Sequence, residues 1–171
     1  SALAKVEFEN NGTIYQREYF ASYPDSVIVC RFSANQKEKQ NLEFFYRSNP
    51  QSKVEVQQIN DNQVLFLGRL KDNDMQFSLR LHIETKGGKV KIGKDGLIKV
   101  KGSDEVVLLL AGDTDYFMNF MPDFSDCNTY VGINPIETTK KTFERIEGLT
   151  YQDLKQRHLN DYCNLFNRVE L

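Results

Sequence analysis

The chain has 171 residues, 40% of them hydrophobic and 27% charged, which is the composition of one globular domain with room for a sizeable core. Its formal net charge of −2 excludes a basic footprint for nucleic acid. The longest apolar run, 106–111, is far shorter than the roughly 20 residues of a membrane-spanning helix, so no membrane span is expected.

The first two thirds of the chain predict β-strands. Apolar and β-branched segments recur at short intervals, and turn-forming pairs such as Asn11-Gly12, Gly87-Gly88 and Asp95-Gly96 separate them. Many short strands at this spacing are typical of an antiparallel β-sandwich, here with two C-terminal helices. The expected strands cover residues 5–9, 13–21, 26–33, 41–47, 53–59, 63–70, 75–84, 89–92, 97–100 and 105–112.

The segment 75–84 has the clearest alternation in the chain. This pattern predicts a strand with one buried face and one face in water. The expected buried face carries Met75, Phe77, Leu79, Leu81 and Ile83. The expected wet face carries Gln76, Ser78, Arg80, His82 and Glu84.

The last third changes character. Residues 113–134 are aromatic and irregular, and they predict a long loop. Pro135 then suits the first turn of a helix that Gly148 ends, with Thr139, Phe143 and Ile146 as its apolar stripe. We therefore divide the chain into a sandwich, 1–134, and two linker helices with the start of a strand, 135–171.

A second helix is predicted to begin at Thr150. Asp153 stands three residues later, as in a capping box. One helical face carries Tyr151, Leu154, His158, Tyr162, Leu165 and Phe166. Residues 168–171 then predict a new strand, and a strand without an obvious partner indicates that the natural polypeptide continues.

Several carboxylates are candidates for chemistry. Asp113 and Asp115 could hold a divalent cation, although such a pair after a strand is more often a turn that binds its own backbone. Asp72 and Asp74 have the same two interpretations. A third pair, Asp123 and Asp126, could act as acid and base on a sugar, but no neighbour in sequence would raise one pKa.

The histidines and cysteines suggest no reactive centre. His82 is expected on the surface, and His158 is expected to pack in the second helix, where Asp161 could set its tautomer. Three widely spaced cysteines form neither a disulfide framework nor a zinc-binding pair. We expect Cys30 and Cys163 to be packed thiols, and the third is Cys127. No catalytic, cofactor-binding or metal-binding residue is nominated, and no cofactor is expected.

An aromatic group lies in the predicted loop, formed by Tyr116, Phe117, Phe120, Phe124 and Tyr130. Its density is high for a solvated loop. These side chains either fill a gap in the core or contact another domain, because an exposed aromatic patch is otherwise a liability. We favour the domain interface.

Three segments carry a family resemblance. They are the block Arg-Glu-Tyr-Phe-Ala-Ser-Tyr-Pro-Asp at 17–25, the pattern Leu-Leu-Leu-Ala-x-x-Thr-Asp-Tyr at 108–116, and the tail at 151–169 with His158, Asp161 and Arg168. Together they resemble the family 95 glycoside hydrolases, the inverting α-L-fucosidases, over almost the whole chain. The resemblance implies an N-terminal β super-sandwich, a helical linker, an (α/α)6 catalytic barrel and a small C-terminal β-domain.

The catalytic machinery of that family lies on the barrel, and no position of this chain matches it. The resemblance therefore implies a non-catalytic part of the N-terminal sandwich. Its partner is the catalytic barrel of the same polypeptide, fucosylated glycans are bound through the parent enzyme, and the compartment is periplasmic or extracellular. The alternatives are a stand-alone carbohydrate-binding module, against which the lack of tryptophan counts, and an assembly module that dimerises through a sandwich edge.

Overall fold

A computed structural model describes residues 2–168. These residues form ten strands and two helices, and no helix among them has the length and apolar character needed to cross a membrane. The elements are β1 (Ala4–Asn10), β2 (Thr13–Ser22), β3 (Val27–Ala34), β4 (Gln40–Phe44), β5 (Ser52–Asn60), β6 (Gln63–Leu70), β7 (Gln76–Lys86), β8 (Lys89–Ile92), β9 (Ile98–Ser103), β10 (Glu105–Thr114), α1 (Pro135–Arg145) and α2 (Tyr151–Phe166).

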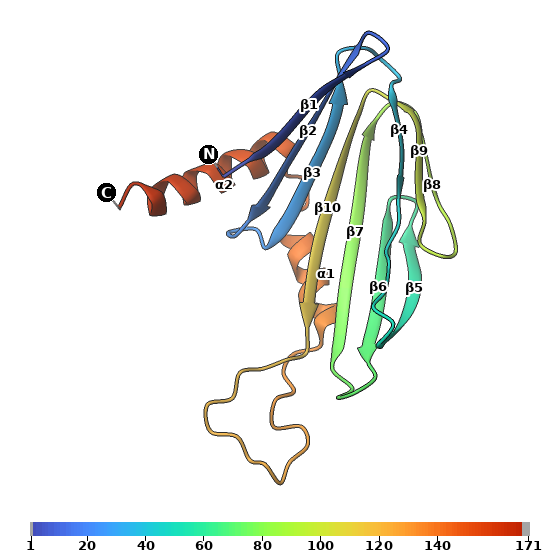
Figure 1. Ribbon diagram of the computed structural model, residues 1–171. Helices are drawn as coiled ribbons and strands as arrows, with labels where there is room; N and C mark the ends of the chain where they lie inside the picture. The colour runs from blue at the N-terminus through green and yellow to red at the C-terminus, as the bar shows by residue number, and fades with distance from the viewer. Residues whose placement is uncertain (1, 169–171) are drawn as a thin grey trace.

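The strands form two antiparallel sheets, as Figure 1 shows. The large sheet has seven strands in the order β1-β2-β3-β10-β7-β6-β5, and the small sheet has three in the order β4-β9-β8. The predicted fold class, an antiparallel β-sandwich with two C-terminal helices, is confirmed. Most predicted strands are correct to within two residues, although β4 ends at Phe44, three residues early, and β9 continues to Ser103.

The main core lies between the two sheets. Phe66 and Ile83 of the large sheet are almost completely buried against Ile98 and Val100 of the small sheet. Phe66 also packs on Tyr46, with the ring centroids 5.0 Å apart. This inner face is apolar, and it includes Leu79, Leu81 and Ile83 of the predicted buried face of β7.

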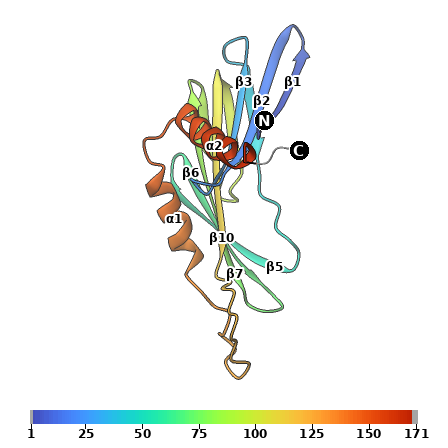
Figure 2. The same ribbon diagram turned by 90° about the vertical axis from the view of Figure 1, so that its left-hand side faces the viewer.

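The opposite face of the large sheet is covered by both helices, as Figure 2 shows. Our prediction that β7 has a wet face is therefore wrong. Ser78 is buried and its hydroxyl lies 2.7 Å from that of Thr139 in α1, and Arg80 is buried beside it. Alternation reports which residues share a face of a strand, but a helix far along the sequence decides whether that face meets water.

Local signals fix the ends of both helices. The Asn134 side chain accepts a hydrogen bond from the Ile136 amide at the start of α1, where Pro135 occupies the first turn. Gly148, with φ at +78°, lies between the helices. The predicted capping box of α2 is confirmed, because Thr150 and Asp153 bind each other's backbone amides.

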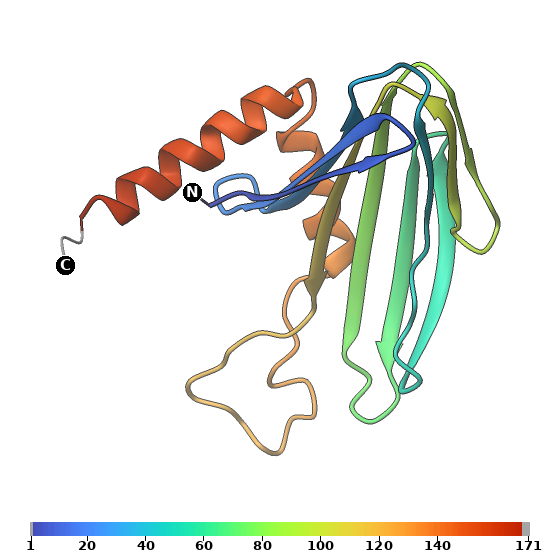
Figure 3. The same ribbon diagram turned by 45° about the horizontal axis from the view of Figure 1, so that its top comes forward.

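Only the first half of α2 packs on the sheet. Tyr151, Leu154 and His158 are buried, whereas Leu165 is 55% exposed and Phe166 is 62% exposed. Figure 3 shows that α2 runs past the edge of the sheet, so the later turns of its apolar face have no sheet beneath them. The strand predicted at 168–171 lies, beyond Arg168, outside the described residues.

Candidate functional site

Glu18 forms an ionic cluster that fastens α2 to the sheet. This carboxylate of β2 is buried and accepts a hydrogen bond from the Tyr151 hydroxyl at 2.8 Å and from Lys155 Nζ at 2.9 Å, both on α2. On the sheet side it pairs with Arg31 of β3 at 3.1 Å and with Lys5 of β1 at 3.3 Å. The cluster thus ties three strands to the first two turns of α2.

The cluster shifts the pKa values of Glu18 and Tyr151 in opposite directions. Burial by itself would raise the pKa of Glu18, but hydrogen bonds from Lys155, Tyr151 and Lys5 outweigh it and lower the pKa to about 2. Burial and the bond to Glu18 raise the pKa of the Tyr151 phenol. The Glu18 carboxylate therefore stays ionised and Tyr151 stays protonated across the physiological range, which suits a structural clamp and not a proton shuttle.

Asp25 forms a second clamp at the turn between β2 and β3. Its carboxylate is fully buried and accepts hydrogen bonds from Ser22 Oγ at 2.6 Å and from Arg157 Nε of α2 at 2.8 Å. The backbone carbonyl of Asp25 accepts a further bond from Arg145 at the end of α1, at 2.9 Å. One turn thus holds both helices.

Sequence reasoning missed both clamps. Glu18 and Asp25 belong to the block 17–25 that carries the sharpest family resemblance, but nothing local showed that they are buried. The partners Tyr151 and Arg157 lie more than 130 positions further along the chain. The one available signal was the carboxylate of Glu18 next to large apolar side chains in a predicted strand.

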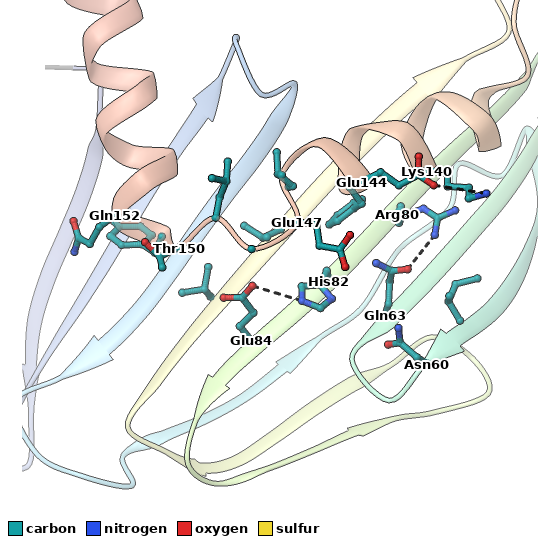
Figure 4. A pocket seen from close by; sticks show the side chains of 18 of the residues that line it. Asn60, Gln63, Arg80, His82, Glu84, Lys140, Glu144, Glu147, Thr150 and Gln152 are labelled. Carbon is teal, nitrogen blue, oxygen red and sulfur yellow. Dashed lines mark hydrogen bonds and ion pairs between the residues drawn. The ribbon is translucent and has the colours of Figure 1, made fainter.

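A groove of about 800 Å³, lined by both polar and apolar side chains, lies beside the helices. It opens between the outer face of β6, β7 and β10 and the underside of α1 with the connection to α2 (Figure 4). Phe143 and Tyr151 are the aromatic residues of its lining, and Arg80 and His82 line it from β7. This volume is within the range of small-molecule sites.

Arg80 is the most unusual side chain of this groove. It is only 6% exposed, and Nη1 donates a hydrogen bond to Gln63 Oε1 at 3.0 Å. Its Nε is buried without a partner among the described residues, and no carboxylate of that part of the chain forms an ion pair with it. Burial lowers the pKa of Arg80, which the negative charges of Glu137 and Glu144 partly oppose.

His82 stands next to Arg80 on β7. Its Nε2 lies 3.6 Å from the carboxylate of Glu84, and its Nδ1 is buried with no partner among residues 2–168. His82 is half-buried and less exposed than expected of a surface histidine, because α1 covers this face and places the Phe143 ring 6.1 Å from the imidazole. The groove therefore combines unsatisfied polar atoms with two aromatic side chains.

The carboxylates singled out from the sequence have structural partners. Asp113 and Asp115 lie at the end of β10 and not in the expected turn: Asp113 accepts a hydrogen bond from the Thr114 amide, and Asp115 accepts one from the Gln76 amide of β7 at 3.0 Å. The other pair lies in the loop. Asp123 binds the amide and hydroxyl of Ser125, which lowers its pKa, and Asp126 binds the Asn128 amide.

At Asp72-Asn73-Asp74, the turn between β6 and β7, Asn73 binds the Met75 amide. Asp74 lies 3.6 Å from Arg69, and both side chains are largely exposed. Within the described residues, no three His, Cys, Asp or Glu side chains group as metal ligands.

The structure also shows the neighbours of His158 and the exposure of the three cysteines. His158 stacks on Phe20 and donates from Nε2 to the carbonyl oxygen of Ala2 at 3.0 Å, so its predicted partner Asp161 is wrong. Cys30 packs against the inner core, and burial raises the pKa of its thiol. Cys163 is exposed on the outer half of α2, contrary to our expectation, and Cys127 is exposed in the loop.

The aromatic loop, 115–134, leads away from the ends of β10 and α1 (Figure 1). Contacts between its two limbs hold its shape, including a β-bridge from Tyr116 to Val131 and a hydrogen bond from Asn119 to the Thr129 carbonyl. Phe120 and Phe124 are 88% and 86% exposed. The exposed aromatic side chains of the loop therefore do not fill a gap in the core. A contact with another domain stays a prediction.

Comparison with known proteins identifies relatives of the fold and of the sequence. The family model described as "Glycosyl hydrolase family 65, N-terminal domain" matches residues 1–119. A putative kojibiose phosphorylase from human microbiome has a similar structure, with a TM-score of 0.57 over 94% of this chain and 22% of that chain. At 6% identity, this likeness concerns the fold alone.

Two curated proteins are similar over the whole chain. Alpha-L-fucosidase 2 of Arabidopsis thaliana is 27% identical over 194 aligned residues, and the probable alpha-fucosidase A of Aspergillus niger is 28% identical over 178. The chain spans 22% of the length of each. The resemblance to α-L-fucosidases seen in the sequence is thereby confirmed.

Proposed function

The chain belongs to the family of glycosyl hydrolase family 65 N-terminal domains, and on this premise we propose that it is the non-catalytic sandwich domain of an α-L-fucosidase-like enzyme. In this proposal its partner is an (α/α)6 catalytic barrel of the same polypeptide. The parent enzyme hydrolyses terminal α-L-fucosyl linkages of glycans with inversion, which requires two groups far enough apart to admit a water molecule. The division into a sandwich, 1–134, and a linker, 135–171, stays a prediction.

One observation carries this proposal. Two α-fucosidases align with all of this chain, and the aligned region is 22% of their length. The described residues form a sandwich with two helices, and they contain no (α/α)6 barrel. Chemistry of the α-fucosidase type therefore needs a further domain.

The aromatic loop is the surface that we assign to the barrel. Phe120 and Phe124 are among the most exposed large apolar side chains of the described residues, and large exposed apolar side chains gathered in one segment indicate an interaction site. The outer half of α2 adds Leu165 and Phe166 at a second place. These surfaces gain hydrophobic stabilisation only when another domain covers them.

The first experiment is an immunoblot of the native host with an antibody against this chain, followed by an assay of the purified native product. We expect a band several times heavier than 19.8 kDa, and release of L-fucose from 4-nitrophenyl α-L-fucoside with inverted anomeric configuration by NMR. A band near 19.8 kDa, or a heavy product without fucosidase activity, would overturn the proposal.

A variant of the native product tests the interface. Replacement of Phe120 and Phe124 by serine should lower the melting temperature of the full polypeptide by several degrees and leave that of the isolated chain unchanged. Tyr23→Ser is the matched control, because Tyr23 is 84% exposed and lies in the turn between β2 and β3. Equal effects of the loop variant and the control would contradict the assignment of the loop.

The two alternatives each have one supporting feature. The groove of mixed polar and apolar lining, with Arg80 among its residues, suits a stand-alone carbohydrate-binding module. All seven residues of β1 are exposed at one edge of the large sheet, which suits an assembly module. A native product near 19.8 kDa would favour these alternatives over the enzyme domain.

A further inference from the structure

The groove beside α1 holds polar atoms that the fold itself does not satisfy. Arg80 Nε and His82 Nδ1 are both buried without partners among the described residues, and both residues line this groove. A buried polar atom without a partner is costly, and a guanidinium without a paired carboxylate is more costly still. These two atoms lie beneath the groove surface, but the Arg80 side chain itself lines the groove, and no carboxylate of the described residues pairs with its guanidinium. This unpaired cation at the groove points to a molecule that binds there.

The remaining polar groups restrict the chemistry of that molecule. Glu84, Glu144 and Glu147 line the groove and only accept hydrogen bonds when ionised. Arg80 only donates. A ligand that satisfies both kinds of group needs atoms that donate and accept at neighbouring positions, and a hydroxyl group does both.

The charge of the groove disfavours an anion. The three glutamates outnumber the cations Arg80 and Lys140, and Lys140 is already 3.7 Å from Glu144. A fourth carboxylate of the lining, Glu105, is bound to Arg31. A neutral ligand rich in hydroxyl groups meets no net repulsion here, whereas a phosphate or carboxylate faces the glutamates.

The aromatic part of the lining completes the site. Phe143 is the aromatic side chain that is partly exposed in the groove, since Tyr151 is buried in the Glu18 cluster, and Figure 4 shows the labelled polar side chains gathered between α1 and the strands. Aromatic faces pack against the C–H faces of sugar rings, while polar groups at the ring edge bind the hydroxyls.

We propose that this groove is a binding subsite for a neutral sugar residue, with Arg80 and Glu147 as the groups that hold its hydroxyls. The inference goes beyond the proposed function, because it concerns binding by this chain itself and does not depend on a catalytic barrel. The substrate class is an uncharged monosaccharide or the end of a neutral oligosaccharide.

Titration of the chain with L-fucose, D-galactose and D-glucose, followed by ¹H–¹⁵N NMR, tests the proposal. At least one sugar should cause saturable shifts at the amides of Gln63, Arg80, His82 and Glu147. The expected dissociation constant is roughly 1 mM, as suits a ligand of this size. Absence of saturable shifts with all three sugars would overturn the proposal, and so would tighter binding of acetate or inorganic phosphate at the same amides.

Two variants locate the site. Arg80→Leu should weaken sugar binding at least tenfold, and Glu147→Gln, at an exposed position that keeps the fold intact, should weaken it several-fold. Glu9→Gln is the matched control, because Glu9 is exposed on β1 and does not line the groove. Unchanged affinity in Glu147→Gln, or an equal loss in Glu9→Gln, would contradict the assignment.

Discussion

The two faces of the large sheet are built in different ways. The inner face meets the small sheet through apolar side chains such as Phe66 and Ile83. The outer face meets the helices through a smaller apolar cluster around Leu154 and through the buried carboxylates Glu18 and Asp25. Mainly hydrophobic burial joins the two sheets, whereas the helices are held by apolar contacts and also by directional ionic bonds to Glu18 and Asp25.

The largest expected effect comes from the inner face. Phe66→Ala should lower the free energy of unfolding by about 4 kcal/mol, because it removes a nearly fully buried ring between the sheets and leaves a cavity. Urea denaturation followed by circular dichroism measures this loss. Phe45→Ala is the control, since Phe45 is 69% exposed. A loss below about 1 kcal/mol in Phe66→Ala would show that the inner face is not the main core.

The ionic clamp of the outer face should produce a smaller effect that depends on pH. The pKa of Glu18 is lowered from its ordinary value of 4.5 to about 2, so its charged form stabilises the folded state. This contribution is fully present above pH 4.5 and is lost as the pH falls from there through about 2. Glu18→Gln should therefore cost about 2 kcal/mol at pH 7 and progressively less toward pH 2.

Urea denaturation of wild type and variant at a series of pH values checks this prediction. Glu9→Gln, on the exposed strand β1, is the matched control and should show no such trend. A difference between wild type and Glu18→Gln that stays constant from pH 7 to the acid limit would contradict the role of the Glu18 charge.

The smallest effect belongs to the outer half of α2. Leu165→Ala should change the free energy of unfolding of this chain by less than about 0.5 kcal/mol, because Leu165 has no sheet beneath it. Leu154→Ala on the buried half of the same helix should cost about 3 kcal/mol. Similar losses in the two leucine variants, measured by thermal or urea unfolding, would show that α2 packs along its whole length.

The sequence predicted the positions of the strands and helices better than it predicted which of their faces are buried. Most strand positions, the turn at Gly87-Gly88 and the capping box of Thr150 are confirmed, because they depend on residues a few positions apart. The exposure of β7 and of Cys163 was predicted wrongly. The same apolar spacing occurs on a packed helix and on one that runs past the sheet edge, so spacing could not separate the two halves of α2.

The groove could not be found from the sequence for the same reason. Arg80 and His82 had the pattern of a solvated strand face, and Phe143 and Glu147 belonged to a separate predicted helix and its end. Only the docking of α1 on β7 through Thr139 and Ser78, 61 positions apart, brings them together.

The sequence by itself thus determined the antiparallel strands, the caps of the helices and the likeness to α-L-fucosidases, because periodicity, turn chemistry and motifs are local properties of the chain. Tertiary structure decided which face of each strand is buried, which carboxylates lose their water and where the groove forms. Burial and ion pairing depend on neighbours brought together from distant positions, as Glu18 and Tyr151 are across 133 positions.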